Sequence, residues 1–377
     1  MDFGLYVHIP FCDKESYYSD FTSYSDRNGK VEEYIDSLII ELSMYKDIIN
    51  QFKIKTIFIG GGNPSSIDPK YIHMVMEYIK DNFYVNKLEE VTIEVDPETL
   101  DYEKSNIYKK SGINRISLRL ETMNNKILKY IGKNYRIKDF YKSYNILREV
   151  GFENINVDLL FGIPGQSIED INNDLNNLID LDIKHISYYG FTIEEGTIMD
   201  KWLEDGKLNL PSEEIDRKMY HNAIKILNNT GFKHYEINSF SKEGYQSKHN
   251  EIYWKIKPYI GLGVGSNSNI NNKRFWNTKD LDKYINKLNN KNLPIIGEEL
   301  INKKIEIAEY CIMGIRLIDG IDKYEFKNRF NIDIYNVYGN VIRNHRDNGL
   351  LKDESNYIRL TKKGIDLANI VEMDFLP

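Results

Sequence analysis

Short apolar runs alternate with longer amphipathic stretches over the first half of the chain. The apolar runs predict strands at residues 4–9, 55–59, 90–95, 115–120, 154–161 and 185–192. The amphipathic stretches predict helices at residues 31–49, 69–83, 137–150 and 167–181. Asp68 is the expected N-cap of the second helix, because Pro69 follows it at the first helical position. These repeats predict an α/β fold, a parallel sheet curved into a barrel or part of one, with active residues at the C-terminal strand ends.

The pattern changes towards the end of the chain. A long helix at 212–230, a strand at 234–238, a glycine-rich segment at 260–268 and a helix at 281–288 extend the barrel. Beyond about residue 298, helices at 303–317, 323–329 and 334–347 precede a hairpin at 350–360 and a helix from Thr361. We therefore expect a barrel over residues 1–210, an extension over 211–297 and a winged-helix-like α+β domain over 298–377.

Composition narrows the class of protein. The chain is 41% apolar and 28% charged, which is typical of globular proteins, and its net charge of −7 argues against a nucleic-acid-binding role. No apolar run approaches the roughly 20 residues of a membrane span. Only Cys12 and Cys311 are present, which favours a reducing compartment over a disulfide framework. With no secretory leader recognisable, the expected location is the cytoplasm.

The segment LYVHIPFCDKESYYSDF at residues 5–21 contains a candidate metal loop. It resembles the cluster loop of the radical-SAM family of oxygen-independent coproporphyrinogen III oxidases and HemW heme chaperones. In that family two further cysteines follow HIPFC, and here Ser16 and Ser19 stand in their places. Thiolates hold a [4Fe–4S] cluster, so Cys12 is expected to be a residual ligand without a working cluster. Asp20 or Cys311 as substitute donors, and an engineered Cys→Ser variant, are the alternatives.

Other segments resemble the family's S-adenosylmethionine (SAM) site. GGGNPSS resembles GGGTPS, and Gly60, Gly61 and Gly62 would let the backbone approach the amino-acid end of SAM. The family also has an acidic strand end, matched by Glu94 in TIEVDPETL. In NINVDLLFGIPGQ, which resembles NINLDLIYGLPGQ, Asp158 lies where a carboxylate would reach a ribose hydroxyl.

Two SAM-site positions depart from the family. RISLRLETMN resembles RISLGVQSFN, with Glu121 at the glutamine position, where its charge would repel the carboxylate of SAM. Lys133 and Tyr135 replace the arginine and histidine of the family's LGRxH segment. Several departures in one site favour natural loss of SAM chemistry, and tolerated variation at single residues is the alternative.

The segment KHYEINSFSKEGYQSKHNEIYW at 233–254 ends in the HNxxYW motif of the HemW group. The resemblance implies that His249 offers an imidazole nitrogen to heme iron and Asn250 orients the ring. Tyr253 and Trp254 would pack against the porphyrin. Asn267 replaces a family histidine in the following GLGVGSNSNI.

The C-terminal segments GIRLIDGID and RLTKKGIDLAN also resemble the HemW group, so the resemblance covers practically the whole chain. The last helix carries Lys362 and Lys363 beside Asp366 and no basic stripe, which favours a lid or partner surface over DNA binding. The leading hypothesis is a heme-binding protein or heme chaperone without cluster or SAM cleavage, passing heme to a recipient protein. The alternatives are a coproporphyrinogen oxidase-like enzyme with atypical cluster ligation and a non-catalytic interaction scaffold.

Overall fold

The computed structural model describes residues 2–14, 16–19, 22–25, 27–86 and 88–377. The alternative ligand Asp20 lies outside these residues. In the described part of the chain, twelve strands form one sheet in the order β12-β11-β10-β9-β1-β2-β3-β4-β5-β6-β8-β7. Its middle contains β1 (Asp2–Ile9), β2 (Lys53–Gly61), β3 (Glu90–Val95), β4 (Arg115–Glu121), β5 (Asn154–Phe161) and β6 (His185–Gly190), all parallel and in chain order. The predicted α/β fold with six parallel strands is confirmed.

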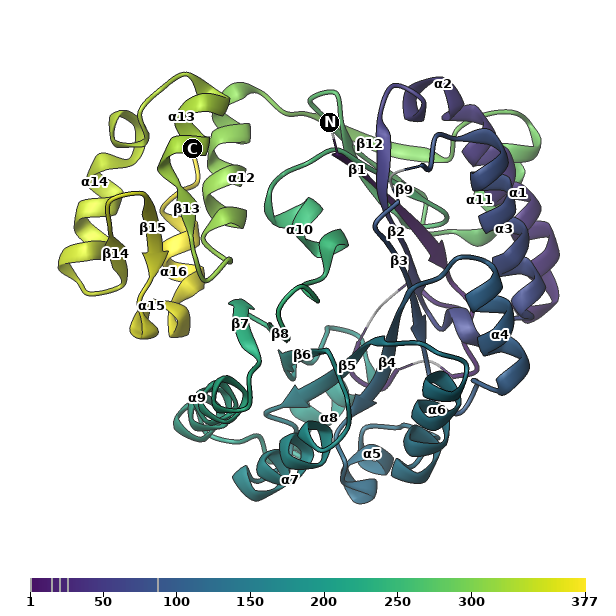
Figure 1. Cartoon of the computed structure of the whole chain (residues 1–377), viewed down its shortest axis with the longest axis horizontal. Helices are drawn as coiled ribbons and strands as arrows, with labels where there is room; N and C mark the ends of the chain where they lie inside the picture. The colour runs from purple at the N-terminus through teal and green to yellow at the C-terminus, as the bar shows by residue number, and fades with distance from the viewer. Residues whose placement is uncertain (1, 15, 20–21, 26, 87) are drawn as a thin grey trace.

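Helices connect the parallel strands and cover the outer face of the curved sheet (Figure 1). They are α1 (Val31–Met44), α2 (Lys46–Ile49), α3 (Pro69–Asn82), α4 (Tyr102–Lys110), α5 (Asn125–Tyr130), α6 (Ile137–Glu149) and α7 (Ile168–Ile179). Local sequence signals set several of their ends. Asp68, the predicted N-cap, accepts a hydrogen bond from the amide of Lys70 at 2.9 Å, and Pro69 begins α3.

Shorter elements extend both edges of the sheet. At one edge β9 (Tyr259–Leu262) runs parallel to β1 and is followed by the antiparallel strands β10 (Asn267–Ile270), β11 (Lys273–Asn277) and β12 (Ile295–Leu300). At the other edge lie β8 (Ser239–Ser241) and β7 (Lys233–Glu236). The helices of this part are α8 (Ile198–Glu204), α9 (Glu213–Asn229), α10 (Lys248–Trp254) and α11 (Leu281–Asn289). α10 contacts β1 and β2 on one side and α12 of the C-terminal region on the other (Figure 1).

The C-terminal region has its own hydrophobic core. It comprises α12 (Lys303–Gly314), β13 (Ile321–Asp322), α13 (Lys323–Phe330), α14 (Ile334–Asp347), β14 (Leu351–Asp353), β15 (Tyr357–Leu360), α15 (Lys362–Asp366) and α16 (Ala368–Met373). The three predicted helices and the hairpin are therefore present, and β13 adds a third strand. Cys311 is fully buried in this core, away from the barrel, and its burial raises the thiol pKa. Cys311 is thus a core residue, and the alternative that it substitutes as a cluster ligand is wrong.

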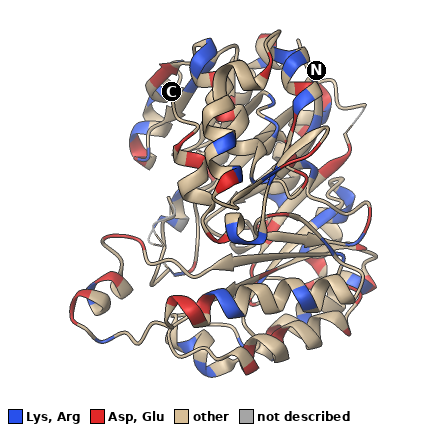
Figure 2. Cartoon of the chain, turned by 90° about the vertical axis from the view of Figure 1, so that its left-hand side faces the viewer, with Lys and Arg blue, Asp and Glu red and all other residues tan. Residues whose placement is uncertain are grey.

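Figure 2 shows Lys and Arg positions interspersed with Asp and Glu positions along the helices. None of the helices that the structure describes is long and apolar enough to cross a bilayer.

Candidate functional site

A cavity of about 600 Å³ opens at the C-terminal ends of the parallel strands, where the sequence predicts the chemistry. It is bordered by residues 12–14, 16, 18, 19 and 23 of the loop that follows β1, by the turn at the end of β2 and by the ends of β3 to β6. The predicted site residues on its wall are Cys12, Ser16, Ser19, Gly61, Gly62, Glu94, Glu121, Lys133, Asp158 and Asn250. Four others lie off its wall, namely Gly60, His249, Tyr253 and Trp254.

The candidate cluster loop is organised around a serine hydroxyl. Ser16 Oγ accepts hydrogen bonds from the amides of Tyr18 at 3.3 Å and Ser19 at 3.2 Å. The amide of Cys12 donates to the carbonyl of Tyr24 at 3.3 Å, which closes the base of the loop. The Ser16 hydroxyl therefore caps a turn of its own loop.

The donors present do not fit a [4Fe–4S] cluster. The loop offers the thiol of Cys12, which is 6% exposed, and the two serine hydroxyls, which do not ionise near neutral pH as thiols do. Within the described ranges, His, Cys, Asp and Glu side chains form no group of three or more suited to a metal ion. The loop therefore lacks the thiolates that a cluster requires.

Aromatic side chains fasten this loop to the barrel rim. The ring of Tyr17 packs against Gly132, where an added Cβ would lie 2.6 Å from the ring. Tyr17 also meets Trp202 edge to face at 6.0 Å between ring centroids, and its carbonyl accepts the amide of Met199 at 2.8 Å. These contacts tie the loop to α8 and to the turn after α5.

The glycine run at the end of β2 is required by backbone packing. Gly61 has φ +125°, and an added Cβ would lie 2.7 Å from the carbonyl oxygen of Ile9. At Gly62 a Cβ would lie 2.7 Å from the carbonyl oxygen of Phe11. Because the end of β2 presses on the end of β1, these glycines have an architectural reason to be present with or without a ligand.

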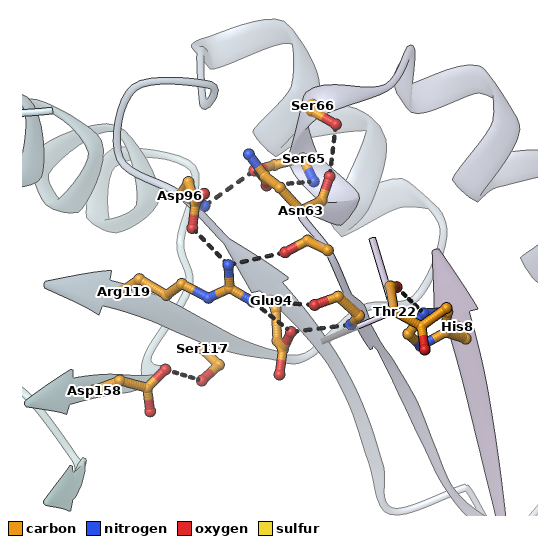
Figure 3. Close-up of polar contacts among 12 residues, drawn as sticks. His8, Thr22, Asn63, Ser65, Ser66, Glu94, Asp96, Ser117, Arg119 and Asp158 are labelled. Atoms are coloured by element: carbon orange, nitrogen blue, oxygen red, sulfur yellow. Dashed lines mark hydrogen bonds and ion pairs between the residues drawn. The ribbon is translucent and has the colours of Figure 1, made fainter. Parts of the chain in front are cut away.

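Arg119 occupies the centre of the polar wall and was not predicted as a site residue. Its guanidinium donates to the carbonyls of Gly62 at 2.9 Å and Gly61 at 3.4 Å, and to the carboxylates of Glu94 at 3.0 Å and Asp96 at 3.2 Å (Figure 3). The sequence did mark this residue as unusual, because Arg119 stands where the family's RISLGVQSFN has glycine.

Asp158 faces the cavity from β5. Its carboxylate accepts a hydrogen bond from Ser117 Oγ at 3.2 Å (Figure 3) and another from Asn156 Nδ2 at 2.8 Å. Burial raises its pKa, although Asn156 and Arg119 act in the opposite direction. Burial likewise raises the pKa of Glu94, against the nearby charge of Arg119.

Glu121 and Lys133 form a buried ion pair, with 2.5 Å between Nζ and Oε1. The hydroxyls of Tyr135 and Tyr18 also donate to the Glu121 carboxylate, at 2.7 Å and 3.2 Å. Burial opposes ionisation, but Lys133, Tyr135 and Arg119 outweigh it and hold the pKa of Glu121 below its ordinary value. The negative charge expected at this position is therefore compensated by a lysine that also departs from the family pattern.

His249 is a buried residue with both ring nitrogens engaged. Nδ1 lies 2.9 Å from Thr56 Oγ1 and Nε2 lies 2.8 Å from the hydroxyl of Tyr253, and the residue is 1% exposed. Burial, with Arg115 nearby, lowers its pKa to about 3. The structure therefore does not present His249 to a heme iron, because neither nitrogen has a free lone pair directed at the cavity.

α10 is anchored at both ends by contacts with other parts of the fold. The carboxylate of Glu90 on β3 accepts the amides of Lys248 at 2.9 Å and His249 at 3.0 Å, which caps the first turn of the helix. The ring of Trp254 lies under the guanidinium of Arg316 at 4.9 Å, which ties α10 to the C-terminal region. Asn250 is the member of the motif that borders the cavity.

Comparison with known proteins agrees with this architecture. The profile of the Radical SAM superfamily matches residues 6–178, and that of the HemN C-terminal domain matches residues 301–367. "Heme chaperone HemW" of Bacillus subtilis (strain 168) is 32% identical over 374 residues, which is 99% of each chain. The HemW of Buchnera aphidicola subsp. Acyrthosiphon pisum is 36% identical over 99% of this chain and 98% of its own. This chain belongs to the HemW family of the radical SAM superfamily.

The fold of this HemW-family chain also matches a solved structure. Coproporphyrinogen III oxidase (HemN) from Escherichia coli superimposes with a TM-score of 0.86 over 99% of this chain and 89% of that one, at 20% sequence identity. The likeness confirms the radical SAM architecture with a C-terminal domain and, at this identity, concerns the fold alone.

Proposed function

We propose that this HemW-family chain binds heme and works without a [4Fe–4S] cluster and without cleaving SAM. One observation supports the second half above all: the loop offers the thiol of Cys12 beside two serines, and Ser16 is turned onto the loop's own amides. Reductive cleavage of SAM needs an electron from the cluster, so loss of the ligands removes the reaction.

Heme binding is proposed from the family and from the cavity. Relatives along the full length of the chain carry the name heme chaperone. The cavity of about 600 Å³ is in the size range of small-molecule sites, and Tyr6, Phe58 and Tyr189 place aromatic surface on its wall for a porphyrin. We assign the contact from the HNEIYW motif to Asn250, because His249 is held by Thr56 and Tyr253. A heme-recipient protein would then dock on the C-terminal domain.

The test is titration of the purified chain with heme, followed by the Soret band, together with iron and acid-labile sulfide per chain after anaerobic reconstitution. We expect saturable heme binding, retained in folded His249→Ala, and no inorganic iron or sulfide above background. A chain that binds no heme contradicts the first half of the proposal. About four iron and four sulfide per chain contradict the second half and favour an enzyme with atypical ligation.

A further inference from the structure

The contacts of Arg119 define a cation subsite within the cavity. Two backbone carbonyl oxygens, from Gly61 and Gly62, and two carboxylates, from Glu94 and Asp96, converge on one point at the ends of β2 and β3 (Figure 3). Each of these groups accepts hydrogen bonds, and the carboxylates add negative charge. Such a set suits an ammonium or guanidinium group and disfavours an anion.

Further hydrogen bonds fix the positions of Glu94 and Asp96, which supply the two carboxylates. The amide of Gly61 donates to the Glu94 carboxylate at 3.2 Å, and the amide of Asp96 donates to Ser65 Oγ at 3.1 Å. The subsite is therefore preorganised, and one guanidinium fills it, since its two terminal nitrogens carry four N–H groups for four acceptors.

We propose that Arg119 is the internal occupant of the subsite that would receive the ammonium of an amino-acid-headed ligand, and that it thereby excludes SAM. The family resemblance places the amino-acid end of SAM at the glycine run and counts Glu94 among the SAM-site positions, and Arg119 contacts both. A ligand ammonium must compete with a cation that the backbone of β4 keeps at high local concentration. Displacement also separates the guanidinium from the carboxylates of Glu94 and Asp96.

A single residue, Arg119, accounts for this difference from the family. In RISLGVQSFN the equivalent residue is glycine, which has no side chain to place in the subsite. One substitution thus changes an open subsite into a filled one while keeping its acceptors satisfied. The inference does not depend on heme binding, so a chain that binds both heme and SAM overturns it and leaves the proposed function standing.

The experiment is isothermal titration of SAM into the wild-type chain, Arg119→Gly, Arg119→Lys and, as control, Lys14→Ala. Lys14 borders the same cavity but donates to Tyr17 and to the Gly132 carbonyl instead of to the subsite. We expect Arg119→Gly to gain at least about tenfold in affinity over wild type, and Lys14→Ala to gain nothing. Equal affinity of wild type and a folded Arg119→Gly overturns the proposal.

Arg119→Lys is included in case Arg119→Gly does not fold, because lysine keeps a positive charge beside Glu94 and Asp96. Its three N–H groups cannot match four acceptors, so a smaller gain in SAM affinity is expected, and a folded Arg119→Lys with wild-type affinity overturns the proposal. A further measurement uses wild type alone. 5′-Methylthioadenosine lacks the amino-acid part, and we expect its affinity to equal or exceed that of SAM; the reverse order overturns the proposal.

Discussion

The loop at residues 10–25 and the segment at residues 233–254 contrast in motif and in structure. The loop has lost two of the three family cysteines, and yet Ser16 accepts the amides of Tyr18 and Ser19 and the Tyr17 ring packs against Trp202. The second segment keeps the whole HNEIYW motif, and yet His249 and Trp254 serve the packing of α10. The loop thus keeps its local hydrogen bonds without the family cysteines, whereas the HNEIYW motif supplies residues that the packing of α10 uses.

The contrast has a physical origin. A cluster ligand contributes to folding only when its metal is bound, so a surface loop can lose it and re-form around a hydroxyl. A buried histidine with two hydrogen-bond partners cannot be lost without leaving those partners unsatisfied. Retention of His249 is therefore weaker support for heme ligation than the sequence alone suggests.

The largest effect is expected when the two missing cysteines are restored to the loop. We expect Ser16→Cys/Ser19→Cys to raise iron and sulfide from background to about four of each per chain after anaerobic reconstitution, because three thiolates are then available. Ser16→Ala/Ser19→Ala is the control and stays at background. Failure of the cysteine variant to take up iron would show that the rest of the loop no longer accommodates a cluster.

His249→Ala should cost about 3 kcal/mol of unfolding free energy, measured by urea denaturation. The substitution leaves Thr56 Oγ1 and the Tyr253 hydroxyl without their partner and opens a cavity next to β1 and β2. Asn250→Ala, on the cavity wall, is the matched control and should cost less than about 1 kcal/mol. Equal losses would argue against a structural role specific to His249.

Acidification should reduce the contribution of His249 to the free energy of unfolding. The pKa of His249 is lowered to about 3 from its ordinary 6.5, so the unfolded chain takes up a proton at this residue below pH 6.5 and the folded chain does not. Stability contributed by His249 is thus complete above pH 6.5 and falls as pH falls through this window. We expect the advantage of wild type over His249→Gln to shrink by about 2 kcal/mol between about pH 7.5 and pH 5. A constant advantage would contradict the assigned burial.

A smaller effect on the free energy of unfolding is expected for Glu121 and Lys133, which form an ion pair on the cavity wall. Glu121→Gln, which restores the family residue, leaves Lys133 buried without its carboxylate, and Lys133→Met leaves Glu121 without its cation. In a double-mutant cycle by denaturation we expect a coupling of about 1–2 kcal/mol, so that the double variant loses less than the sum. Strict additivity would show that the two departures from the family are independent.

Ser16→Ala should give the smallest change, a cost of about 1 kcal/mol confined to the loop. Hydrogen exchange at the amides of Tyr18 and Ser19 is the measurement, since Ser16 Oγ accepts from both. Ser19→Ala is the matched control, because Ser19 contributes its amide to the turn. Unchanged exchange in Ser16→Ala would show that the Ser16 hydroxyl does not hold this turn.

Periodicity determined most of the fold. β3 and β5 have the predicted bounds at both ends, because apolar residues recur at every second position along EVTIEV and most of NINVDLLF, which is the period of a strand. The helix α10 was not predicted, since its seven residues show no apolar period and its first turn is capped by Glu90, distant in sequence. The predicted domain boundaries at 210 and 297 stay predictions.

The sequence by itself determined the fold class, the family and the loss of cluster ligands, because each depends on residue type and local spacing. The tertiary structure alone decided what Arg119, Lys133 and His249 contact. A long polar side chain can reach acceptors on several neighbouring strands, and only the packed sheet selects among them. The same packing decides that the His249 ring contacts Thr56 and Tyr253 and that the Arg119 guanidinium contacts Glu94 and the glycine carbonyls, and motif matching gives neither set of contacts.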